Sequence, residues 1–201
     1  MSNDQQEVTA QEIFDEVATH LAKQKVQSAK RNEARGDHSC LYRGPNSTKC
    51  AFGIFIPDEL YSEALETTTV STLMACARNK RKNSVNYGYS APLRNAMTTE
   101  LIAVLEPLDV HEDLLRQLQK IHDAETGPAF WGLQLAELAK DEGLEFDRAD
   151  FEQKLAQPAI DPGACTCGAQ PETPHSEDCP VTIKVRAAFA ASGEGAEGAA
   201  Q

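Results

Sequence analysis

The fold class follows most directly from one segment, Asp109-Val-His-Glu-Asp-Leu-Leu-Arg-Gln-Leu-Gln-Lys-Ile-His-Asp123. Its apolar residues recur every three or four positions, which places them on one face of an α-helix. These residues are Leu114, Leu115, Leu118 and Ile121. Asp109 and Glu112 have the capping-box pattern, in which side chains at the N-cap and three residues later bond free backbone amides. We therefore expect a helix that begins near Asp109.

Helical signals of the same kind extend through most of the chain. Thr9 and Glu12 form a second capping box, which opens a helix expected over residues 10–30. Pro128 suits the first turn of another helix, and Gly143 suits the C-terminal end of that helix. Further helices are expected at residues 57–66, 71–79, 99–105 and 148–156, with a polar loop at residues 80–93.

One segment has a different pattern. Two short apolar runs flank Gly44-Pro-Asn-Ser47, a combination of residues that favours a turn. We expect a β-hairpin near residues 40–56 that packs on helices, because an isolated hairpin is marginal in water. A helical second arm is the alternative. Gly53 within that arm suggests a bulge or the close approach of another backbone.

The predicted architecture is mainly α, of the α+β type: a helical domain with one β-hairpin and a small C-terminal module resembling a zinc knuckle. Pro, Gly and Asp concentrate between the domain and the module, which indicates a linker. The expected divisions are a flexible N-terminus at 1–8, the core domain at 9–156, the linker at 157–164, the Cys/His module with a short helix at 165–190, and a disordered tail at 191–201.

Four potential zinc ligands lie close together in the C-terminal module: Cys165, Cys167, His175 and Cys179. Three thiolates and one imidazole complete a tetrahedral zinc site and leave no position open for a substrate. We predict a structural zinc ion that holds the module together, because so short a segment has almost no core. Reactive or incidental thiols are the alternative, since the spacing is Cys-x-Cys and not the common Cys-x2-Cys.

Charge is distributed unevenly along the chain. Residues 1–100 carry 12 Lys+Arg and 12 Asp+Glu, whereas residues 101–201 carry 7 and 19, so the whole net charge of −12 lies in the second half. An acidic surface repels nucleic acid and suits a basic protein partner. No apolar run is long enough for a membrane span, and the N-terminus has no secretory signal, so a cytoplasmic, reducing location is expected.

A second group of potential metal ligands consists of His38, Cys40, Cys50 and His122. Strand pairing could bring the two cysteines together, and a histidine from elsewhere in the chain could complete the set. The favoured alternative is that both cysteines are small apolar side chains that face the core.

A basic cluster precedes two tyrosines: Arg78, Lys80, Arg81, Lys82, Tyr87 and Tyr89. Cations of this kind can follow the phosphates of a nucleic acid while bases stack on the tyrosine rings. A solvated loop explains the same residues and is favoured, because the protein is acidic overall.

His122 and Asp123 form an adjacent pair that can move protons in catalysis. The favoured interpretation is that the histidine complements the dipole at the end of its helix. The chain has no Walker loop, nucleophile elbow, zinc-protease motif or dinucleotide fingerprint. Whether the protein is an enzyme is left open, and catalysis is not favoured.

Several motifs together carry a resemblance to a known group: Gln11-Glu-Ile-Phe-Asp-Glu-Val17, Cys40-Leu-Tyr-Arg-Gly-Pro-Asn46, Lys49-Cys-Ala-Phe-Gly-Ile-Phe-Ile-Pro-Asp-Glu59, and Leu118-Gln-Lys-Ile-His-Asp123 followed by a tryptophan. The chain resembles, over roughly residues 10–145, a group of proteins encoded by bacteriophages and prophages. No activity is assigned to that group, so the resemblance transfers no functional residues. The C-terminal module looks like an addition to the shared core.

These observations favour a small phage-type accessory or regulatory protein that binds and modulates a host or viral protein and carries a structural zinc ion. The alternative is a nucleic-acid-associated factor that uses the basic cluster at 78–82 and the zinc module. Either protein would act in the host bacterial cytoplasm if it is phage-encoded. The oligomeric state is left open.

Overall fold

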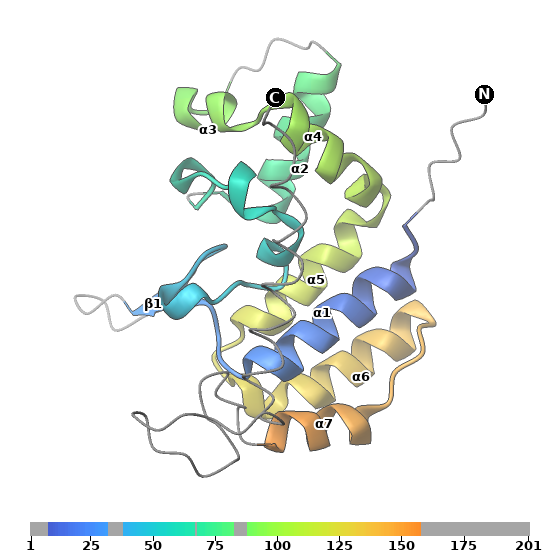
Figure 1. Ribbon diagram of the computed structural model, residues 1–201. Helices are drawn as coiled ribbons and strands as arrows, with labels where there is room; N and C mark the ends of the chain where they lie inside the picture. Colours follow the sequence, from blue (N-terminus) through green and yellow to red (C-terminus); the bar gives the residue numbers. More distant parts are fainter. Residues whose placement is uncertain (1–7, 32–37, 67, 83–87, 158–201) are drawn as a thin grey trace, which may run out of the picture. The chain divides into compact units, whose positions relative to one another are not determined.

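The computed structural model describes residues 8–31, 38–66, 68–82 and 88–157 of the chain. The chain divides into two units, residues 1–157 and 158–201, and all the described residues belong to the first. This described part is mainly helical and contains one small two-stranded antiparallel sheet, as Figure 1 shows. None of its helices is both long and apolar enough to cross a membrane.

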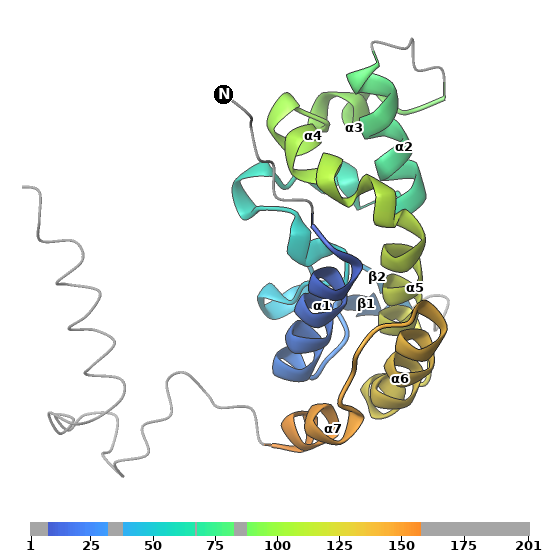
Figure 2. The same ribbon diagram turned by 90° about the vertical axis from the view of Figure 1, so that its right-hand side faces the viewer.

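Helix α5 (Glu112–Asp123) is the element on which several others pack. It contacts α1 (Ala10–Gln24), α2 (Val70–Arg81) and α6 (Trp131–Glu142), and Figure 2 shows the same packing from the side. The remaining helices are α3 (Ala91–Ala96), α4 (Thr99–Leu105) and α7 (Arg148–Ala156). Helix α7 contacts α1 and α6, and α4 contacts α2. These contacts bury the apolar faces that the sequence pattern predicts.

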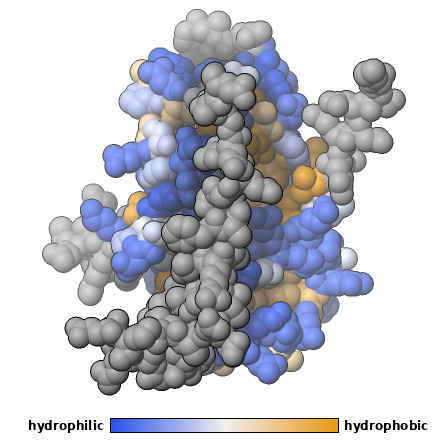
Figure 3. All heavy atoms as spheres, in the orientation of Figure 1, coloured by the Kyte–Doolittle hydropathy of each residue, from blue (hydrophilic) through white to orange (hydrophobic). Residues whose placement is uncertain are grey.

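The core between these helices consists of apolar side chains with almost no exposure to solvent. Its largest members include Ile13, Phe14, Phe52, Leu73 and Trp131. Hydrophilic residues cover much of the described surface in the view of Figure 3, with apolar residues exposed in smaller areas. Burial of the helix faces therefore supplies the main stabilising force, as expected for an amphipathic helical protein.

Local signals for the ends of helices are confirmed where they involve near neighbours. The Thr9 backbone amide donates to Glu12 Oε2 at 2.8 Å, and the Glu12 amide donates to Thr9 Oγ1 at 3.2 Å, which completes the predicted capping box. Gly143 ends α6 with a φ of 68°, the left-handed conformation that glycine adopts without strain. Helices α4 and α7 occupy the residues expected for them.

Helix α1 is shorter than expected. It ends at Gln24 and not at Lys30, because Lys25 adopts a left-handed φ of 62° while its amide still donates to Leu21 O at 2.9 Å. The chain then changes direction and reaches strand β1 (Ala29–Arg31) within a few residues. The early end of α1 places the connecting segment, residues 25–28, beside the end of α5.

The predicted cap at Asp109 is wrong. Asp109 lies in a 3-10 turn, Glu106–His111, that precedes α5, and its carboxylate pairs with Arg78 at 2.6 Å. The ion pair with a distant arginine replaces the local bond to a backbone amide. Elsewhere, residues 57–66 form two 3-10 turns in place of a helix, and α2 and α3 extend into the expected loop at 80–93.

A β-hairpin is present, but it does not lie at residues 40–56. Strand β1 pairs with β2 (His38–Cys40) in an antiparallel register that sets Ala29 opposite Cys40. Beyond β2 the only described pairing of this kind is an isolated bridge between Arg43 and Lys49. The expected second arm contains a 3-10 turn, Gly53–Phe55, which agrees with the helical alternative.

Side chains from distant helices explain why the expected second strand does not form. The Lys49 amide donates to Gln24 Oε1 at 2.8 Å, and the Lys49 carbonyl accepts from Gln24 Nε2 at 2.9 Å. The Phe52 amide donates to Gln119 Oε1 at 2.9 Å. These backbone groups are therefore satisfied by two glutamine side chains and are not available to a neighbouring strand.

Candidate metal centre

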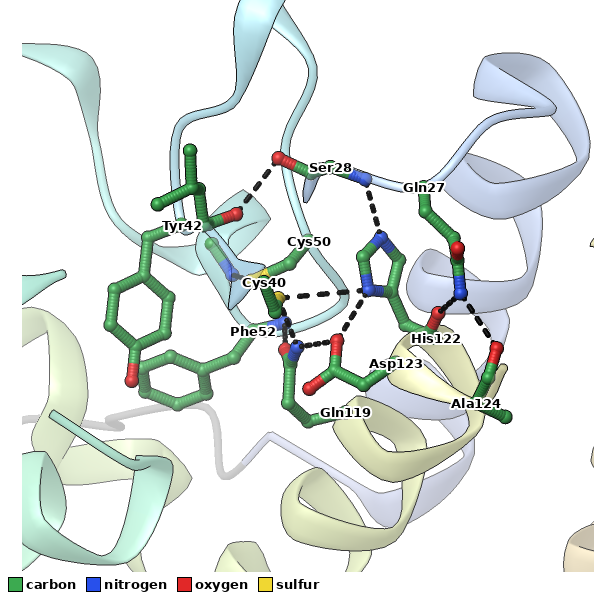
Figure 4. Close-up of polar contacts among 12 residues, drawn as sticks. Gln27, Ser28, Cys40, Tyr42, Cys50, Phe52, Gln119, His122, Asp123 and Ala124 are labelled. Atoms are coloured by element: carbon green, nitrogen blue, oxygen red, sulfur yellow. Dashed lines mark hydrogen bonds and ion pairs between the residues drawn. The ribbon is translucent and has the colours of Figure 1, made fainter. Parts of the chain in front are cut away.

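Cys40, His122 and Asp123 meet where strand β2 and helix α5 end (Figure 4). One ligand atom from each residue lies within 4.8 Å of the other two. The grouping could hold a metal ion, because thiolate, imidazole and carboxylate are all ligands that zinc accepts. His122 is buried, Cys40 is half-buried and Asp123 is exposed, so the site lies at the edge of the core.

Cys50 adds a second thiol beside this cluster. It is fully buried, and its Sγ accepts from the Gly53 amide at 3.2 Å. Cys50 is not among the residues whose ligand atoms all lie within 4.8 Å of one another. Of the predicted second metal group, the structure brings Cys40 and His122 together, with Cys50 in the neighbouring segment outside the group. The side chain of His38 lies outside the described part. Asp123, which directly follows His122 in the sequence, joins the group as a ligand that the sequence does not predict for this site.

The backbone fixes which ring nitrogen of His122 carries a proton. The Ser28 amide lies 2.9 Å from His122 Nε2, and a backbone amide can only donate, so Nε2 accepts and has no proton. The proton of the neutral ring is therefore on Nδ1, which donates to Asp123 Oδ1 at 2.8 Å. Trp131 stacks on the ring, with centroids 5.8 Å apart and an interplanar angle of 21°. The ring is held on both edges and one face.

Gln119 connects the cluster to the core backbone. Its side-chain amide donates to Cys40 Sγ at 2.9 Å and to Asp123 Oδ1 at 2.8 Å, while its carbonyl oxygen accepts from the Phe52 amide. Sequence reasoning overlooked Gln119 and Ser28. The only local signal for Gln119 is its position one helical turn before Asp123, which places both side chains on the same side of α5.

The Cys40 thiol is held in its neutral form. Its pKa is raised well above that of a free cysteine, first by the neighbouring thiol of Cys50, then by burial and by the negative charge of Asp123. A thiol in this state is a weak nucleophile.

The geometry also differs from that of a catalytic triad. There, the two ring nitrogens serve the nucleophile and the carboxylate separately. Here Nδ1 faces both Cys40 Sγ, at 3.8 Å, and Asp123, while Nε2 is occupied by Ser28. His122 therefore has no free nitrogen with which to activate the thiol, and the arrangement does not support nucleophilic catalysis.

The segment that carries Cys50 is anchored at Lys49. His20 Nε2 donates to the Lys49 carbonyl at 2.9 Å, next to the bond from Gln24. Burial lowers the pKa of His20, the positive charges of Lys49 and Lys23 act in the same direction, and the bond to the carbonyl opposes them. The Lys49 ammonium pairs with Asp58 at 2.8 Å and is the main cause that lowers the pKa of that carboxyl group.

Arg43 holds the two halves of residues 42–58 together. Its guanidinium donates to the carbonyls of Gly53 and Ile56 and to the carboxylate of Asp58, and it lies 5.2 Å from the ring centroid of Tyr61. The segments Cys40–Asn46, Lys49–Glu59 and Leu118–Asp123, which the sequence singles out separately, thus meet around one cluster.

The basic segment at the end of α2 is largely occupied by intramolecular contacts. Arg78 pairs with Asp109 and Glu112, each at 2.6 Å, and these partners raise its pKa, Glu112 most strongly. Arg81 pairs with Glu106 at 2.8 Å, and the Lys80 ammonium donates to the carbonyls that end α3. Arg78, Lys80 and Arg81 are therefore engaged in contacts within the chain.

The other candidates for nucleic-acid contact are Lys82, Tyr87 and Tyr89. Lys82 is exposed, and Tyr89 is half-buried, with its hydroxyl accepting from Asn79 Nδ2 at 3.4 Å. Tyr87 lies outside the described residues, so the structure does not test it.

The predicted C-terminal zinc ligands, Cys165, Cys167, His175 and Cys179, also lie outside the described residues. The zinc site at these four residues therefore remains a prediction from the sequence. Comparison of the chain with known protein families, with curated proteins and with solved structures finds no match.

Proposed function

We propose that this protein is a zinc-binding accessory protein of bacteriophage type that acts by binding another protein and not by catalysis. The observation that carries the proposal is the convergence of Cys40, His122 and Asp123, with Cys50 beside them, at the edge of the helical core. Two thiols, an imidazole and a carboxylate match the ligand preference of zinc.

The distances support a metal centre of tetrahedral geometry. Ligand atoms bound to one tetrahedral zinc ion lie about 3.3–3.8 Å apart, given zinc–ligand bonds of about 2.0–2.3 Å. Cys40 Sγ and His122 Nδ1 are separated by 3.8 Å, close to that value. His122 Nδ1 and Asp123 Oδ1 are 2.8 Å apart because they share a hydrogen bond, and they would have to separate slightly.

The surroundings of three of these side chains also support ligation. Gln119 Nε2 donates to both Cys40 Sγ and Asp123 Oδ1, and the Gly53 amide donates to Cys50 Sγ. Donors aimed at sulfur and carboxylate atoms orient them for a metal ion. Because the pKa of Cys40 is raised, zinc would have to displace the proton from that thiol when it binds. Cys40, His122 and Asp123 supply three positions, and the Cys50 thiol would have to move closer to supply the fourth. With four protein ligands the zinc would be structural, and it would tie β2 and the Cys50 segment to α5.

Zinc content of the full chain tests this proposal. We expect about two zinc ions per chain in the wild type, one in the core cluster and one in the predicted C-terminal module. The double variant Cys40→Ser, Cys50→Ser and the double variant Cys165→Ser, Cys167→Ser should each retain about one, and the fourfold variant close to none. The measurement is metal analysis of purified protein whose helical content has been checked by circular dichroism.

Cys76→Ser is the matched control, because Cys76 is a buried free thiol on α2 that takes no part in the cluster. It should keep the zinc content of the wild type. An unchanged content in the Cys40, Cys50 variant would refute the core site, and an unchanged content in the Cys165, Cys167 variant would refute the C-terminal site.

The partner we propose is a basic host or viral protein. Helix α6 presents Glu137 and Asp141 on one exposed side, within the half of the chain that carries the net negative charge. In affinity capture from infected cells, Glu137→Lys with Asp141→Lys should lose a protein that the wild type retains, because charge reversal opposes a basic surface. Glu16→Lys, an exposed change on α1, is the control and should retain it. Capture of nucleic acid in place of a protein would favour the alternative function.

A further inference from the structure

The hydrogen bond that His122 accepts does not suit metal ligation. The donors around Cys40, Cys50 and Asp123 all point at atoms that become anionic ligands. At His122 the hydrogen bond runs in the opposite sense to that expected for a metal ligand: the Ser28 amide donates to Nε2 at 2.9 Å, so Nε2 accepts. A metal-bound histidine normally donates from its second nitrogen to an acceptor. The mismatch is confined to this hydrogen bond.

Metal ligation and the Ser28 hydrogen bond exclude each other. A metal ion at Nδ1 needs the lone pair of that nitrogen, so the proton of the neutral ring must move to Nε2. The Nε2 hydrogen would then face the Ser28 amide hydrogen across 2.9 Å, in a site where both residues are fully buried. Two buried donors that face each other are unfavourable, so one of them has to move.

We infer that the cluster is a metal-operated switch: zinc binding at Nδ1 releases the Ser28 amide and shifts the segment Lys25–Ser28, and zinc loss restores the bond. This inference rests on the proposed zinc site and adds a conformational consequence to it. Zinc binding is thereby weakened, because the ion has to displace an existing buried hydrogen bond.

Residues 25–28 are placed to transmit such a shift. They connect the end of α1 to β1, and Lys25 already departs from helical geometry. The Ser28 carbonyl accepts from the Leu41 amide, and the Ser28 hydroxyl donates to the Leu41 carbonyl at 2.8 Å. Movement of Ser28 would therefore displace Leu41, which directly follows β2 and the Cys40 ligand.

The test uses the full chain with Cys165→Ser and Cys167→Ser, so that zinc occupies only the core cluster. Nitrogen NMR of the imidazole rings reports the protonated nitrogen of His122, and amide hydrogen exchange reports Ser28. Without zinc we expect the proton on Nδ1 and a protected Ser28 amide. With zinc we expect the proton on Nε2 and exchange at Ser28 at least about fivefold faster, the factor for loss of one buried hydrogen bond.

Two controls make the result specific. The Leu144 amide, which donates to Ala139 O at 2.7 Å on α6, should keep its exchange rate. Ser28→Ala keeps the backbone amide and loses the hydroxyl, so it should show the same proton movement and the same faster exchange; loss of the effect there would assign it to the hydroxyl and overturn the inference.

The two proposals fail in different ways. Zinc bound at one ion per chain, with the proton still on Nδ1 and Ser28 still protected, overturns the switch and leaves the zinc-binding function standing. Absence of zinc from the core cluster, seen as no metal retained by the Cys165, Cys167 variant, rejects both.

Discussion

Replacement of Trp131 with alanine is expected to lower the free energy of unfolding by about 4 kcal/mol, within the range for aromatic-to-alanine changes in a core. Trp131 has no exposure to solvent and stacks on His122. Its indole N–H has no hydrogen-bond partner among the described residues, so the loss comes from packing alone. The cavity would also free one face of the His122 ring. Urea unfolding followed by far-ultraviolet circular dichroism is the measurement. Tryptophan fluorescence is unsuitable, because Trp131 is the one tryptophan of the chain and the variant lacks it.

Phe130→Ala is the matched control. Phe130 is the adjacent aromatic residue, but it is 49% exposed, so its removal should lower the free energy of unfolding by less than about 1 kcal/mol. Equal losses in the two variants would show that Trp131 is not part of the core that supports the cluster.

Replacement of Gly53 with alanine is the second large effect, with an expected loss of about 3 kcal/mol in the free energy of unfolding. A Cβ at this position would lie 2.4 Å from the Tyr42 carbonyl oxygen and 3.1 Å from the Tyr42 Cα. Tyr42 cannot move aside easily, because its amide donates to Glu66 and its hydroxyl donates to the Thr68 carbonyl, each at 2.8 Å. The same clash should displace the Gly53 amide from Cys50 Sγ.

Gly143→Ala separates this clash from the general effect of removing a glycine. Gly143 has a positive φ of 68° with open space around it, so alanine there should cost only about 1 kcal/mol of conformational strain. Chemical denaturation of both variants, together with their zinc content, is the measurement. If Gly53→Ala is no more destabilising than Gly143→Ala, the close approach to Tyr42 is not a constraint on the fold.

The residue types of the candidate centre could be predicted, but not their arrangement. The sequence predicts His38, Cys40, Cys50 and His122 as one group, because cysteine and histidine are zinc ligands. For Asp123 the sequence suggests only a partnership with His122 in proton transfer. Gln119 and Ser28 had no signal, because an amide side chain and a backbone N–H acquire a role only when a distant atom lies opposite them.

The prediction of the hairpin shows the same limit. The turn residues at 44–47 indicated paired strands on either side, and the isolated bridge between Arg43 and Lys49 is what remains of that pairing. A local pattern does not reveal that Gln24 and Gln119 satisfy the backbone at Lys49 and Phe52.

Signals between near neighbours in the chain were sufficient for the helical class, the capping box at Thr9, the end of α6 at Gly143 and the apolar face of α5. Capping bonds and helical periodicity join residues three or four positions apart, so they form wherever the helix forms. The location of the hairpin and the direction of the hydrogen bond between Ser28 and His122 depend on the packed fold. The bonds responsible join Gln24 to Lys49, Gln119 to Phe52 and Ser28 to His122, across 25, 67 and 94 positions, and such contacts exist only after α1, α5 and the sheet have packed.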